Sequence, residues 1–322
     1  MVKVAIAGGT GHTGLHIVEG IVESGKHDIV VLSRKSTHPV LVALGVPIIT
    51  VSYDDPASLK QALQGVHTVI STISGLTPDA MTVPQLALLD AAAKAGVKRF
   101  APSEFGTRSI PDNPVELYRD KWPVLEAVRR SGLEYTVFEI GIFMNTLASG
   151  TPGVGHLPPV KFIFDVEGCR ATIPGDGSAH IVYTRVEDVG RFVAASLDLE
   201  AWTEVSQIRG DRKTYNEVIK LAEEARGKRL RIRLCYEREA RLIGFAGKEF
   251  EVTYLSEEQL MKTIAERADK KLDIQKMFAQ WWLEVLRDNP AGYEGKNLNE
   301  LCPQVQPVDI EEFLRKWWSK AE

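Results

Sequence analysis

The chain has 322 residues, 44% of them hydrophobic, which is enough to build the core of one large α/β domain or two smaller ones. Its 39 lysine and arginine residues nearly balance 43 aspartate and glutamate residues, and no long run of one sign indicates a nucleic-acid partner. Apolar runs are strand-length, well below the roughly 20 residues of a membrane span, and no signal-peptide pattern follows Met1. We therefore expect a cytoplasmic protein with no membrane partner. Cys169, Cys235 and Cys302 are widely spaced and form no CxxC pattern, so neither a disulfide framework nor a metal site is expected.

The first half of the chain alternates short apolar runs with helical patterns. Residues 2–7 are rich in β-branched side chains and end in glycines, and His12 to Ser24 then shows the apolar spacing of a helix. Strands that are apolar on both faces and alternate with helices predict a Rossmann-type, doubly wound parallel sheet of the α/β class. The next predicted elements are strands at 28–33 and 47–51, a helix at 56–64, a strand at 67–71, a helix at 81–95, a strand at 97–102, a helical region near 114–131 and a strand at 134–139.

A segment rich in glycine and proline, residues 149–159, interrupts this rhythm and is typical of a loop. We place the lobe boundary there. Residues 1–150 are predicted to form the Rossmann domain, with part of 181–210 returning to it, and 151–322 mainly a smaller C-terminal α/β lobe that binds substrate. The elements predicted beyond the loop are a strand at 160–164, a turn at 174–177, helices at 187–197, 214–226, 256–266, 273–287 and 309–319, and a strand at 231–235.

Three glycines, Gly8, Gly11 and Gly14, follow the first predicted strand and open the first predicted helix. Such glycines let the backbone approach a pyrophosphate, while the helix N-terminus offers unpaired N–H donors and a positive dipole end. The motif predicts a dinucleotide site, and the alternative is a glycine-rich turn without a ligand. His12 is placed to hydrogen-bond a phosphate, although a solvent-facing histidine fits equally well. The predicted phosphate contacts are Gly8, Thr10, Gly11, His12, Thr13 and Gly14.

The end of the second predicted strand indicates which dinucleotide binds. NAD-binding domains usually place an acidic residue there to hold the ribose hydroxyls, whereas this chain has Arg34 and Lys35. A guanidinium can grip a 2′-phosphate and an adjacent ammonium adds charge, so NADPH is favoured over NADH. The alternative is two basic residues on a solvated loop. Ser71 and Thr72 follow another predicted strand at the same edge of the sheet, and we expect them to line the ribose or nicotinamide half of the cofactor.

A second motif, Pro102 to Gly106, ends a predicted strand at this edge, and Lys121 stands fifteen residues beyond it. We expect Ser103, Glu104 and Phe105 to contact the cofactor together with Lys121. A free lysine titrates at about 10.4, so burial or positive charge must lower its pKa before it can act as a base near neutrality. Taken alone, a lysine on a helix is more often a solvated residue.

The chain resembles the isoflavone reductase-like proteins, which belong to the NmrA-like, atypical short-chain dehydrogenases and include phenylcoumaran benzylic ether, pinoresinol-lariciresinol and leucoanthocyanidin reductases. The resemblance spans nearly the whole chain. It is carried by the residues from Gly8 to Gly14 and from Pro102 to Gly106, by Lys121, by Leu125-Glu126-Ala127-x-x-x-Ser131-Gly132-Leu133-x-Tyr135-Thr136, by Ile181-x-Tyr183-x-x-Val186-Glu187-Asp188-Val189-Gly190, by Asn216-Glu217-Val218, and by Pro303-Gln304-Val305-x-Pro307-Val308-Asp309-Ile310-Glu311-Glu312-Phe313.

The resemblance implies that NADPH delivers hydride to a phenolic substrate and that Lys121 acts as general base or acid on the phenol. Pro123 is a departure from the uninterrupted helix expected in those reductases. Either a new helix starts with Pro123 in its first turn, or the lysine is displaced. The Trp122 indole either packs in the core or walls the pocket.

The apolar region from 141 to 164 is predicted to form the substrate pocket, lined by Phe143, Met144, Asn145 and Phe164, although these residues fit a lobe-interface core as well. The predicted function is an NADPH-dependent reductase of an aromatic, phenolic or polyketide-like secondary metabolite, acting as a monomer or homodimer. The alternative is a non-catalytic NADP(H) sensor that regulates a partner protein. A tyrosine-dependent short-chain reductase is a weaker third reading, because the usual Tyr-x-x-x-Lys pair is absent here.

Overall fold

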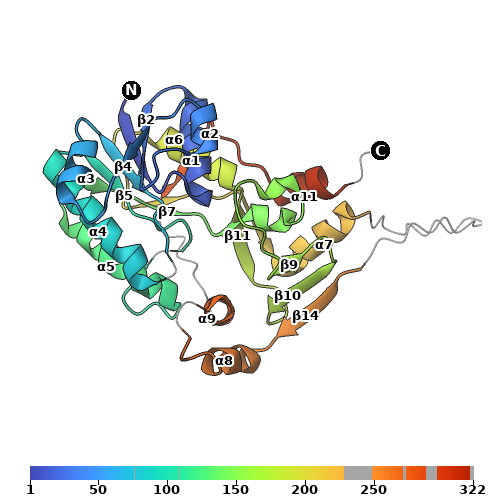
Figure 1. The fold of residues 1–322 in the computed structure, drawn as a ribbon. Helices are drawn as coiled ribbons and strands as arrows, with labels where there is room; N and C mark the ends of the chain where they lie inside the picture. Colours follow the sequence, from blue (N-terminus) through green and yellow to red (C-terminus); the bar gives the residue numbers. More distant parts are fainter. Residues whose placement is uncertain (76, 108, 228–248, 271–272, 288–295, 320–322) are drawn as a thin grey trace, which may run out of the picture.

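A six-stranded parallel sheet forms the centre of the first lobe (Figure 1). The computed structural model describes residues 1–75, 77–107, 109–227, 249–270, 273–287 and 296–319. The strand order β3-β2-β1-β4-β5-β6 is that of a doubly wound sheet and confirms the predicted Rossmann-type class. Winding reverses between β1 and β4, so a ligand crevice is expected at their carboxyl ends. The strands are β1 Lys3–Ala7, β2 Asp28–Ser33, β3 Ile48–Thr50, β4 Thr68–Ser71, β5 Arg99–Ala101 and β6 Glu134–Tyr135.

Helices cover both faces of this sheet, because its central strand is apolar on both. Side chains alternate along a strand, so Val4 and Ile6 of β1 pack toward α1 and α6, whereas Ala5 and Ala7 pack toward α3, α4 and α5. This burial on two sides explains why the strand is a continuous apolar run. The helices of the first lobe are α1 His12–Ser24, α2 Pro39–Ala43, α3 Pro56–Ala62, α4 Pro78–Ala95, α5 Glu116–Arg130 and α6 Val186–Ser196.

The helices α1 and α6 touch backbone to backbone. A Cβ added at Gly20 of α1 would lie 2.3 Å from the carbonyl carbon of Gly190 in α6, and one added at Gly190 would lie 2.2 Å from the His16 carbonyl oxygen. No side chain fits between them, so glycine is required on both helices. Helix α6 thereby packs on the first lobe, and β12 pairs with β7 in a small sheet beside the large one, whereas Ile181 and Tyr183 of β11 lie in the core of the second lobe.

The second lobe is built around one hydrophobic core and two small sheets. That core joins helices far apart in sequence, with Trp282 of α9, Tyr215 of α7 and Phe313 of α11 all buried in it. The remaining elements are β7 Val137–Glu139, β8 Ile142–Phe143, η1 Met144–Ala148, η2 Pro152–Val154, β9 Phe164–Asp165, β10 Arg170–Pro174, β11 His180–Thr184, β12 Val205–Gln207, β13 Asp211–Thr214, α7 Tyr215–Ala225, β14 Glu251–Leu255, α8 Glu257–Ala265, α9 Ile274–Leu286, β15 Lys296–Asn297, α10 Leu298–Leu301 and α11 Ile310–Trp318.

Two predicted strands differ from the structure, and a third cannot be compared with it. The strand predicted at 134–139 is split at Thr136, because β6 pairs with β5 whereas β7 leaves the large sheet and pairs with β12. Of the strand predicted at 160–164, only its last residue is extended, in β9. The strand predicted at 231–235, with Cys235, lies outside the described residues. None of the strands β10 to β14 was predicted, and some of them, such as Asp211–Thr214, are polar and lack an apolar run.

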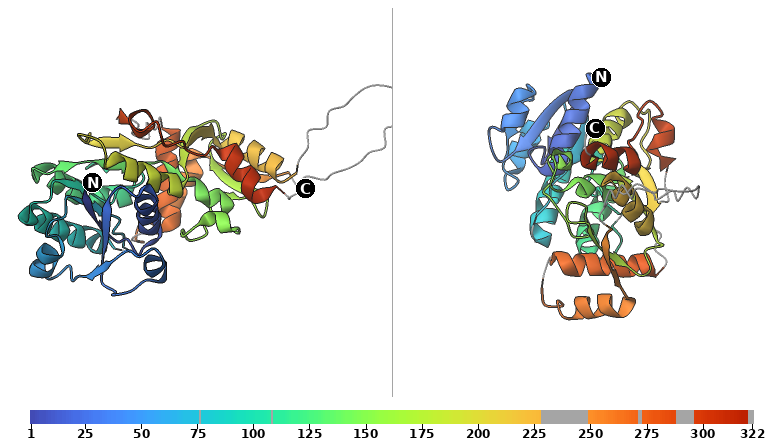
Figure 2. Two further views of the ribbon diagram at one scale, coloured as in Figure 1. Left: turned by 90° about the horizontal axis from the view of Figure 1, so that it is seen from above. Right: turned by 90° about the vertical axis from the view of Figure 1, so that its right-hand side faces the viewer.

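Two helices close the side of the molecule away from the N-terminus. In the right-hand view of Figure 2, α8 and α9 (orange) lie one above the other, and α9 is the one nearer the body of the protein. Figure 1 shows α9 end-on between the lower end of α5 and the sheet of β10 and β14. Among the described residues, no helix combines the length and apolar character needed to cross a bilayer.

Candidate functional site

The glycine turn closes tightly before α1. Gly8 has a φ of +83°, and a Cβ on it would strike Thr72 at 2.8 Å, while a Cβ on Gly14 would lie 2.3 Å from the Gly8 carbonyl oxygen. Gly11 is the N-cap of α1, and no side chain caps that helix end. The first N–H groups of α1 therefore have no side-chain partner, the arrangement that binds an anionic phosphate group.

The loop after β4 supports this turn rather than presenting side chains to a ligand. The Ser71 side chain has no accessible surface. The Thr72 amide and hydroxyl both donate to the Ala7 carbonyl, at 2.8 and 3.1 Å. The structure thus buries the Ser71 hydroxyl and engages the Thr72 hydroxyl in holding the glycine turn.

Arg34 and Lys35 follow β2 and are exposed. The Ser33 hydroxyl accepts a hydrogen bond from the Lys35 amide at 3.0 Å, which shapes the start of this loop. Tyr53, which no sequence motif indicated, lies near Arg34: burial raises the pKa of Tyr53 to about 12, and the Arg34 charge opposes that rise. Two basic side chains and a phenol ring therefore surround the place where a 2′-phosphate is expected.

The Pro102 to Gly106 segment is held by its own polar contacts. The buried Gln85 side chain accepts a hydrogen bond from the Ser103 amide at 2.9 Å. The Glu104 carboxylate is also buried, and it accepts from the amide and hydroxyl of Ser109 at 3.1 and 2.7 Å. Phe105 has a φ of +37°, a strained value for a non-glycine residue, and its ring stacks on Phe138 with centroids 5.6 Å apart.

Lys121 points back to this segment from α5. Its ammonium donates to the Glu104 carbonyl oxygen at 3.1 Å and lies 5.6 Å from the centre of the Tyr118 ring. Burial lowers the pKa of Lys121, whereas the nearby Glu104 carboxylate raises it. Burial also raises the pKa values of Glu104 and Tyr118. The strand-end motif and Lys121, predicted separately from sequence, therefore meet at the carboxyl edge of the sheet.

Pro123 does not end the helix that carries Lys121. A single helix runs from Glu116 to Arg130, with Pro123 exposed inside it. Proline removes its own N–H bond toward residue 119, one turn back, and leaves the bond made by the Lys121 amide intact. A new helix starting at Pro123, the first alternative raised by the sequence, is therefore not observed, and the pose of Lys121 toward a bound cofactor stays a prediction. The Trp122 ring packs against a small core with Leu125 and Val137, so it is not a pocket wall.

Three of the four predicted substrate contacts are structural. Met144 and Asn145 are fully buried and Phe164 is 4% exposed, so none can touch a substrate unless its neighbours move. The Asn145 side chain accepts from the Val186 amide at 2.8 Å and donates to the Gly153 carbonyl at 2.9 Å. Phe143 is half-buried and packs on the first-lobe core. These residues are the lobe-interface core that was the alternative interpretation.

A cavity of about 240 Å³ lies elsewhere, beside the loop that follows β4. Gly75 of that loop, Glu116 and Leu117 of α5, and residues of α9 form its walls. Leu117 is one helical turn before Lys121, so the two lie on the same face of α5. The cavity therefore adjoins the cofactor edge. Its α9 wall was not apparent in the sequence, because those residues lie more than 150 positions from Lys121.

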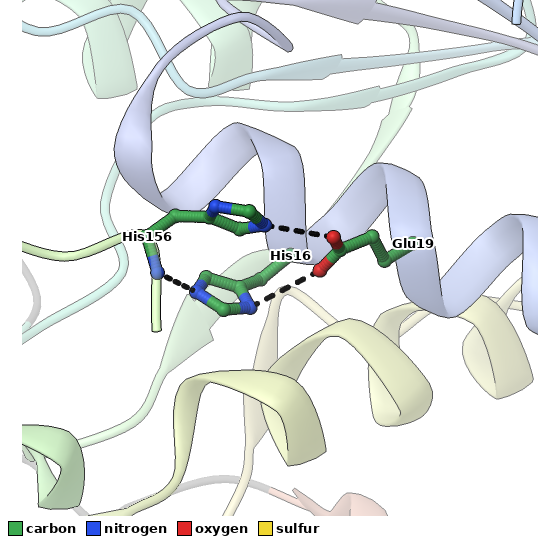
Figure 3. A group of neighbouring side chains, drawn as sticks. All are labelled: His16, Glu19 and His156. Carbon is green, nitrogen blue, oxygen red and sulfur yellow. Dashed lines mark hydrogen bonds and ion pairs between the residues drawn. The ribbon is translucent and has the colours of Figure 1, made fainter. Parts of the chain in front are cut away.

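His16, Glu19 and His156 are the group of described side chains close enough to hold a metal ion (Figure 3). The His156 amide donates to His16 Nε2 at 3.0 Å, so the proton of a neutral His16 is on Nδ1, which faces Glu19 at 3.4 Å. Neither nitrogen then has a free lone pair for a metal.

The group instead fastens the 149–159 loop to α1. His156 Nε2 lies 2.7 Å from the Glu19 carboxylate, and His12 Nδ1 donates to the His156 carbonyl at 2.7 Å. Burial lowers the pKa of His16 to about 4, and the charge of His156 acts in the same direction. His12, predicted at the phosphate turn, is thus exposed and tied to this loop.

We expect Gly11→Val to abolish NADPH binding while the protein stays folded. Gly11 has an ordinary φ of −88°, and a Cβ there would meet only the Gly8 carbonyl, at 3.1 Å, so the added side chain would occupy the phosphate side of the turn. Fluorescence titration and thermal unfolding measure the two effects. Gly14→Val is the contrast, because its Cβ collides with backbone and should lower the melting temperature. Normal cofactor binding by Gly11→Val would show that the turn is not the phosphate site.

The buried His16 predicts a folded state that loses stability as the pH is lowered. Its pKa is 6.5 in an unfolded chain and about 4 when folded, so the unfolded state binds more protons between these values. Lowering the pH from 7 to 4 should cost about 3 kcal/mol of unfolding free energy from this residue. Urea unfolding of wild type and His16→Gln at several pH values isolates the contribution of His16 to the free energy of unfolding, since glutamine can still accept a hydrogen bond from the His156 amide. Equal pH dependence of the two proteins would contradict it.

Comparison with known proteins places these features in a family. A family model described as the NmrA-like family matches residues 2–314. An oxidoreductase named BOA1 from Botryotinia fuckeliana is 33% identical over 235 residues, which are 71% of this chain and 77% of that protein. The phenylcoumaran benzylic ether reductase IRL1 of Ginkgo biloba is 28% identical over 337 residues, 98% of each chain.

Solved structures share the fold. A structure described as "AtPrR2 with NADP+ and (+)pinoresinol" superimposes with a TM-score of 0.73 at 22% identity, over 98% of each chain. The ternary complex of leucoanthocyanidin reductase from Vitis vinifera gives a TM-score of 0.73 at 19% identity, over 99% of this chain and 100% of that one. Because the family model covers almost every residue between the glycine turn and α11, the chain belongs to the NmrA-like family, and its resemblance to the isoflavone reductase-like proteins is confirmed.

Proposed function

We propose that this protein is an NADPH-dependent reductase of a small aromatic substrate, a phenolic or polyketide-like secondary metabolite, in which Lys121 exchanges a proton with the substrate. The observation that carries the proposal is the position of the Lys121 amine. It is held at the carboxyl edge of the sheet by the Glu104 carbonyl, and burial lowers its pKa. A lysine with a lowered pKa at the ligand edge of a Rossmann sheet is typical of a catalytic group.

The tight glycine turn supports the cofactor half of the proposal. It brings no side chain over the N-terminus of α1, which suits a pyrophosphate. NADPH, when bound, supplies the hydride. We propose that it is held at the phosphates by Gly8, Thr10, Gly11, His12, Thr13 and Gly14, at the 2′-phosphate by Arg34 and Lys35, and near the nicotinamide by Ser103, Glu104, Phe105 and Lys121, with the backbone of Ser71 and Thr72 beside the ribose.

Lys121 would act as the base in this reaction. An unperturbed lysine is protonated near neutrality, so a lowered pKa leaves part of the amine unprotonated and able to accept a phenolic proton, which the resulting ammonium can later return. The Glu104 carboxylate has the opposite effect on the pKa of Lys121 and favours the protonated amine. Glu104 is therefore proposed to keep the pKa from falling too far, which leaves the amine able both to accept and to donate.

The names of the relatives support an aromatic substrate. Proteins 27 to 29% identical to this chain are named phenylcoumaran benzylic ether reductase and pinoresinol-lariciresinol reductase. The apolar Leu117 and Met277 walls of the cavity suit such a ring, and we propose this cavity as the substrate site. Residues 1–150, with the returning 181–210, would then be the cofactor lobe and 151–322 the substrate lobe. Monomer or homodimer, and a cytoplasmic location, stay predictions.

Arg34→Ala, Lys35→Ala should remove the preference for NADPH over NADH, because the pair supplies the charge that reads the 2′-phosphate. The measurement is the ratio of the two dissociation constants. NADH affinity should change little. Arg129→Ala, Arg130→Ala is a matched control, since it removes another adjacent basic pair at the far end of α5. An unchanged ratio in the Arg34, Lys35 variant would show that these side chains do not contact the phosphate.

Lys121→Ala should lose turnover while keeping NADPH affinity. Removing a positioned acid or base costs on the order of 10² to 10⁴ in rate, or about 3 to 5.5 kcal/mol. Lys121→Arg should not rescue it, because a guanidinium keeps its proton. Oxidation of NADPH with a panel of phenolic ethers, quinones and enones is followed by absorbance, and Lys94→Ala on the exposed side of α4 is the control. Equal turnover of Lys121→Ala and wild type would show that Lys121 is not the acid or base of the reaction.

A further inference from the structure

A buried charged residue of α9 reaches α5 at the wall of the cavity. The Lys276 side chain is 6% exposed, and its ammonium lies 2.7 Å from Glu116 Oε1. It also donates to the carbonyl oxygens of Ala268 at 3.2 Å and Lys270 at 3.4 Å. The ammonium is thus engaged by one ion pair and two hydrogen bonds, all of them to groups of the protein itself. Lys276 therefore serves to join α9 to α5 at the cavity wall.

Gln280, one turn further along α9, holds the same carboxylate. Its side-chain N–H donates to Glu116 Oε1 at 3.2 Å, and its carbonyl oxygen accepts from the Glu116 amide at 3.3 Å. Both Lys276 and Gln280 are buried. Glu116 is thus fixed at its backbone and at one carboxylate oxygen, so its side chain is held in one orientation on the cavity wall.

The second oxygen of this carboxylate is left over. In the part of the chain that the structure describes, Oε1 takes the 2.7 Å ion-pair contact with Lys276 and the hydrogen bond from Gln280, and no hydrogen bond reaches Oε2. The Glu116 side chain is 33% exposed, whereas Lys276 and Gln280 are buried. Tying α5 to α9 needs only Oε1. The cavity wall therefore carries a fixed group that can accept a hydrogen bond and, while ionised, cannot donate one.

We propose that Glu116 is a specificity-determining residue that accepts a hydrogen bond from a free hydroxyl group of the substrate. This inference rests on the proposed function and names the substrate class more narrowly: a phenolic compound with a second hydroxyl at some distance from the reacting one. Glu116 and Lys121 are five residues apart, about 7.5 Å along the helix axis and about 140° around it, and Leu117 of the cavity wall lies between them on the helix surface. A molecule that engages both must therefore be extended and cross Leu117.

The chemistry of this oxygen also sets what the cavity rejects. A methyl ether has no proton to donate and would leave the carboxylate without a partner, at the cost of its desolvation. A substrate carboxylate would be repelled by the like charge. The site should therefore separate a free phenol from its methyl ether even though the two have nearly the same shape, because unpaired polar groups discriminate more strongly than small changes in apolar contact.

Binding of two small probes tests the proposal. Guaiacol carries one phenolic hydroxyl, and veratrole is its methyl ether. Their dissociation constants are measured by ligand-observed NMR on the Lys121→Ala protein, with and without NADP+, so that Glu116 is the remaining proposed phenol site. Guaiacol should bind about tenfold more tightly than veratrole, since a hydrogen bond to a charged group is lost with the ether.

Adding Glu116→Gln to this protein should bring the ratio to about one or below. Glutamine keeps an oxygen for Lys276 and Gln280 but places an N–H₂ donor where Oε2 was. Glu126→Gln, an exposed carboxylate of the same helix, should leave the ratio unchanged. Met277→Trp fills the cavity without touching the charged network and should weaken both probes together. Thermal unfolding of each variant shows whether it is folded.

An unchanged preference for guaiacol in the folded Glu116→Gln variant would overturn the proposal. Absence of binding by either probe, or binding insensitive to Met277→Trp, would overturn it as well. The readout is binding and not turnover, so the hydroxyl-binding role of Glu116 and the proposed reductase activity can be contradicted independently of each other. A protein that discriminates the probes but never oxidises NADPH would retain Glu116 as a hydroxyl-reading residue and lose the proposed reductase activity. A protein that oxidises NADPH but binds guaiacol and veratrole equally well would retain the proposed reductase activity and lose the proposed role of Glu116.

Discussion

The backbone contact between α1 and α6 is the constraint on which the rest of the arrangement depends. Gly20 and Gly190 let the two helices approach until carbonyl groups would meet any added Cβ at 2.2 to 2.3 Å. Helices usually pack with their axes 8 to 10 Å apart, a spacing set by the side chains between them, and here there are none at the contact. The helix that opens at the glycine turn is thereby locked to a segment that comes from beyond the lobe boundary, so the position of one lobe follows from the other.

Two buried polar residues extend this link to the second lobe. Asp188, in the first turn of α6, is fully buried and accepts hydrogen bonds from Arg185 at 2.6 Å and from the Val308 amide at 3.0 Å. Asn145 binds the start of α6 and the 149–159 loop together. A buried polar group without a partner is costly, so such fully bonded residues specify one arrangement of the chain. The C-terminal segment, the glycine-rich loop and α6 are therefore held in register with α1.

The electrostatics of the candidate site follow from that fixed frame. The Glu104 carboxylate is buried and bonded to Ser109, and its main chain accepts from Lys121, so one residue both positions the amine and opposes the effect of burial on its pKa. On the other side of α5, Lys276 and Gln280 hold Glu116 through a single oxygen. One helix thus presents the Lys121 amine, which we propose exchanges a proton with the substrate, and the fixed Glu116 carboxylate, each oriented by a partner from a different part of the chain. Phe105 at this edge has a strained φ, a conformation that persists only where the surrounding structure holds the backbone in place.

Local sequence was sufficient to predict the class of fold and the tight glycine turn before α1. A strand apolar on both faces, three spaced glycines and a basic pair after the next strand are all short-range patterns, and each follows from steric or electrostatic rules within a few residues. The helix around Lys121 was predicted in the same way, and it runs through Pro123 because proline removes only one of its own helix bonds. The apolar 141–164 region was open to two interpretations, pocket or core, since hydrophobicity alone cannot tell a wall from an interior.

Only the tertiary structure decided between those two, and it placed Met144, Asn145 and Phe164 in the interior. It also decided that Thr72 braces the glycine turn, that β6 and β7 part at Thr136, and that α9 crosses to α5. These contacts join residues tens to more than a hundred positions apart. Their presence depends on which surfaces remain to be covered once the large sheet has formed, and no local pattern contains that information. Short local motifs therefore predict the Rossmann half of the protein. The arrangement of the second lobe depends instead on how it packs on the first.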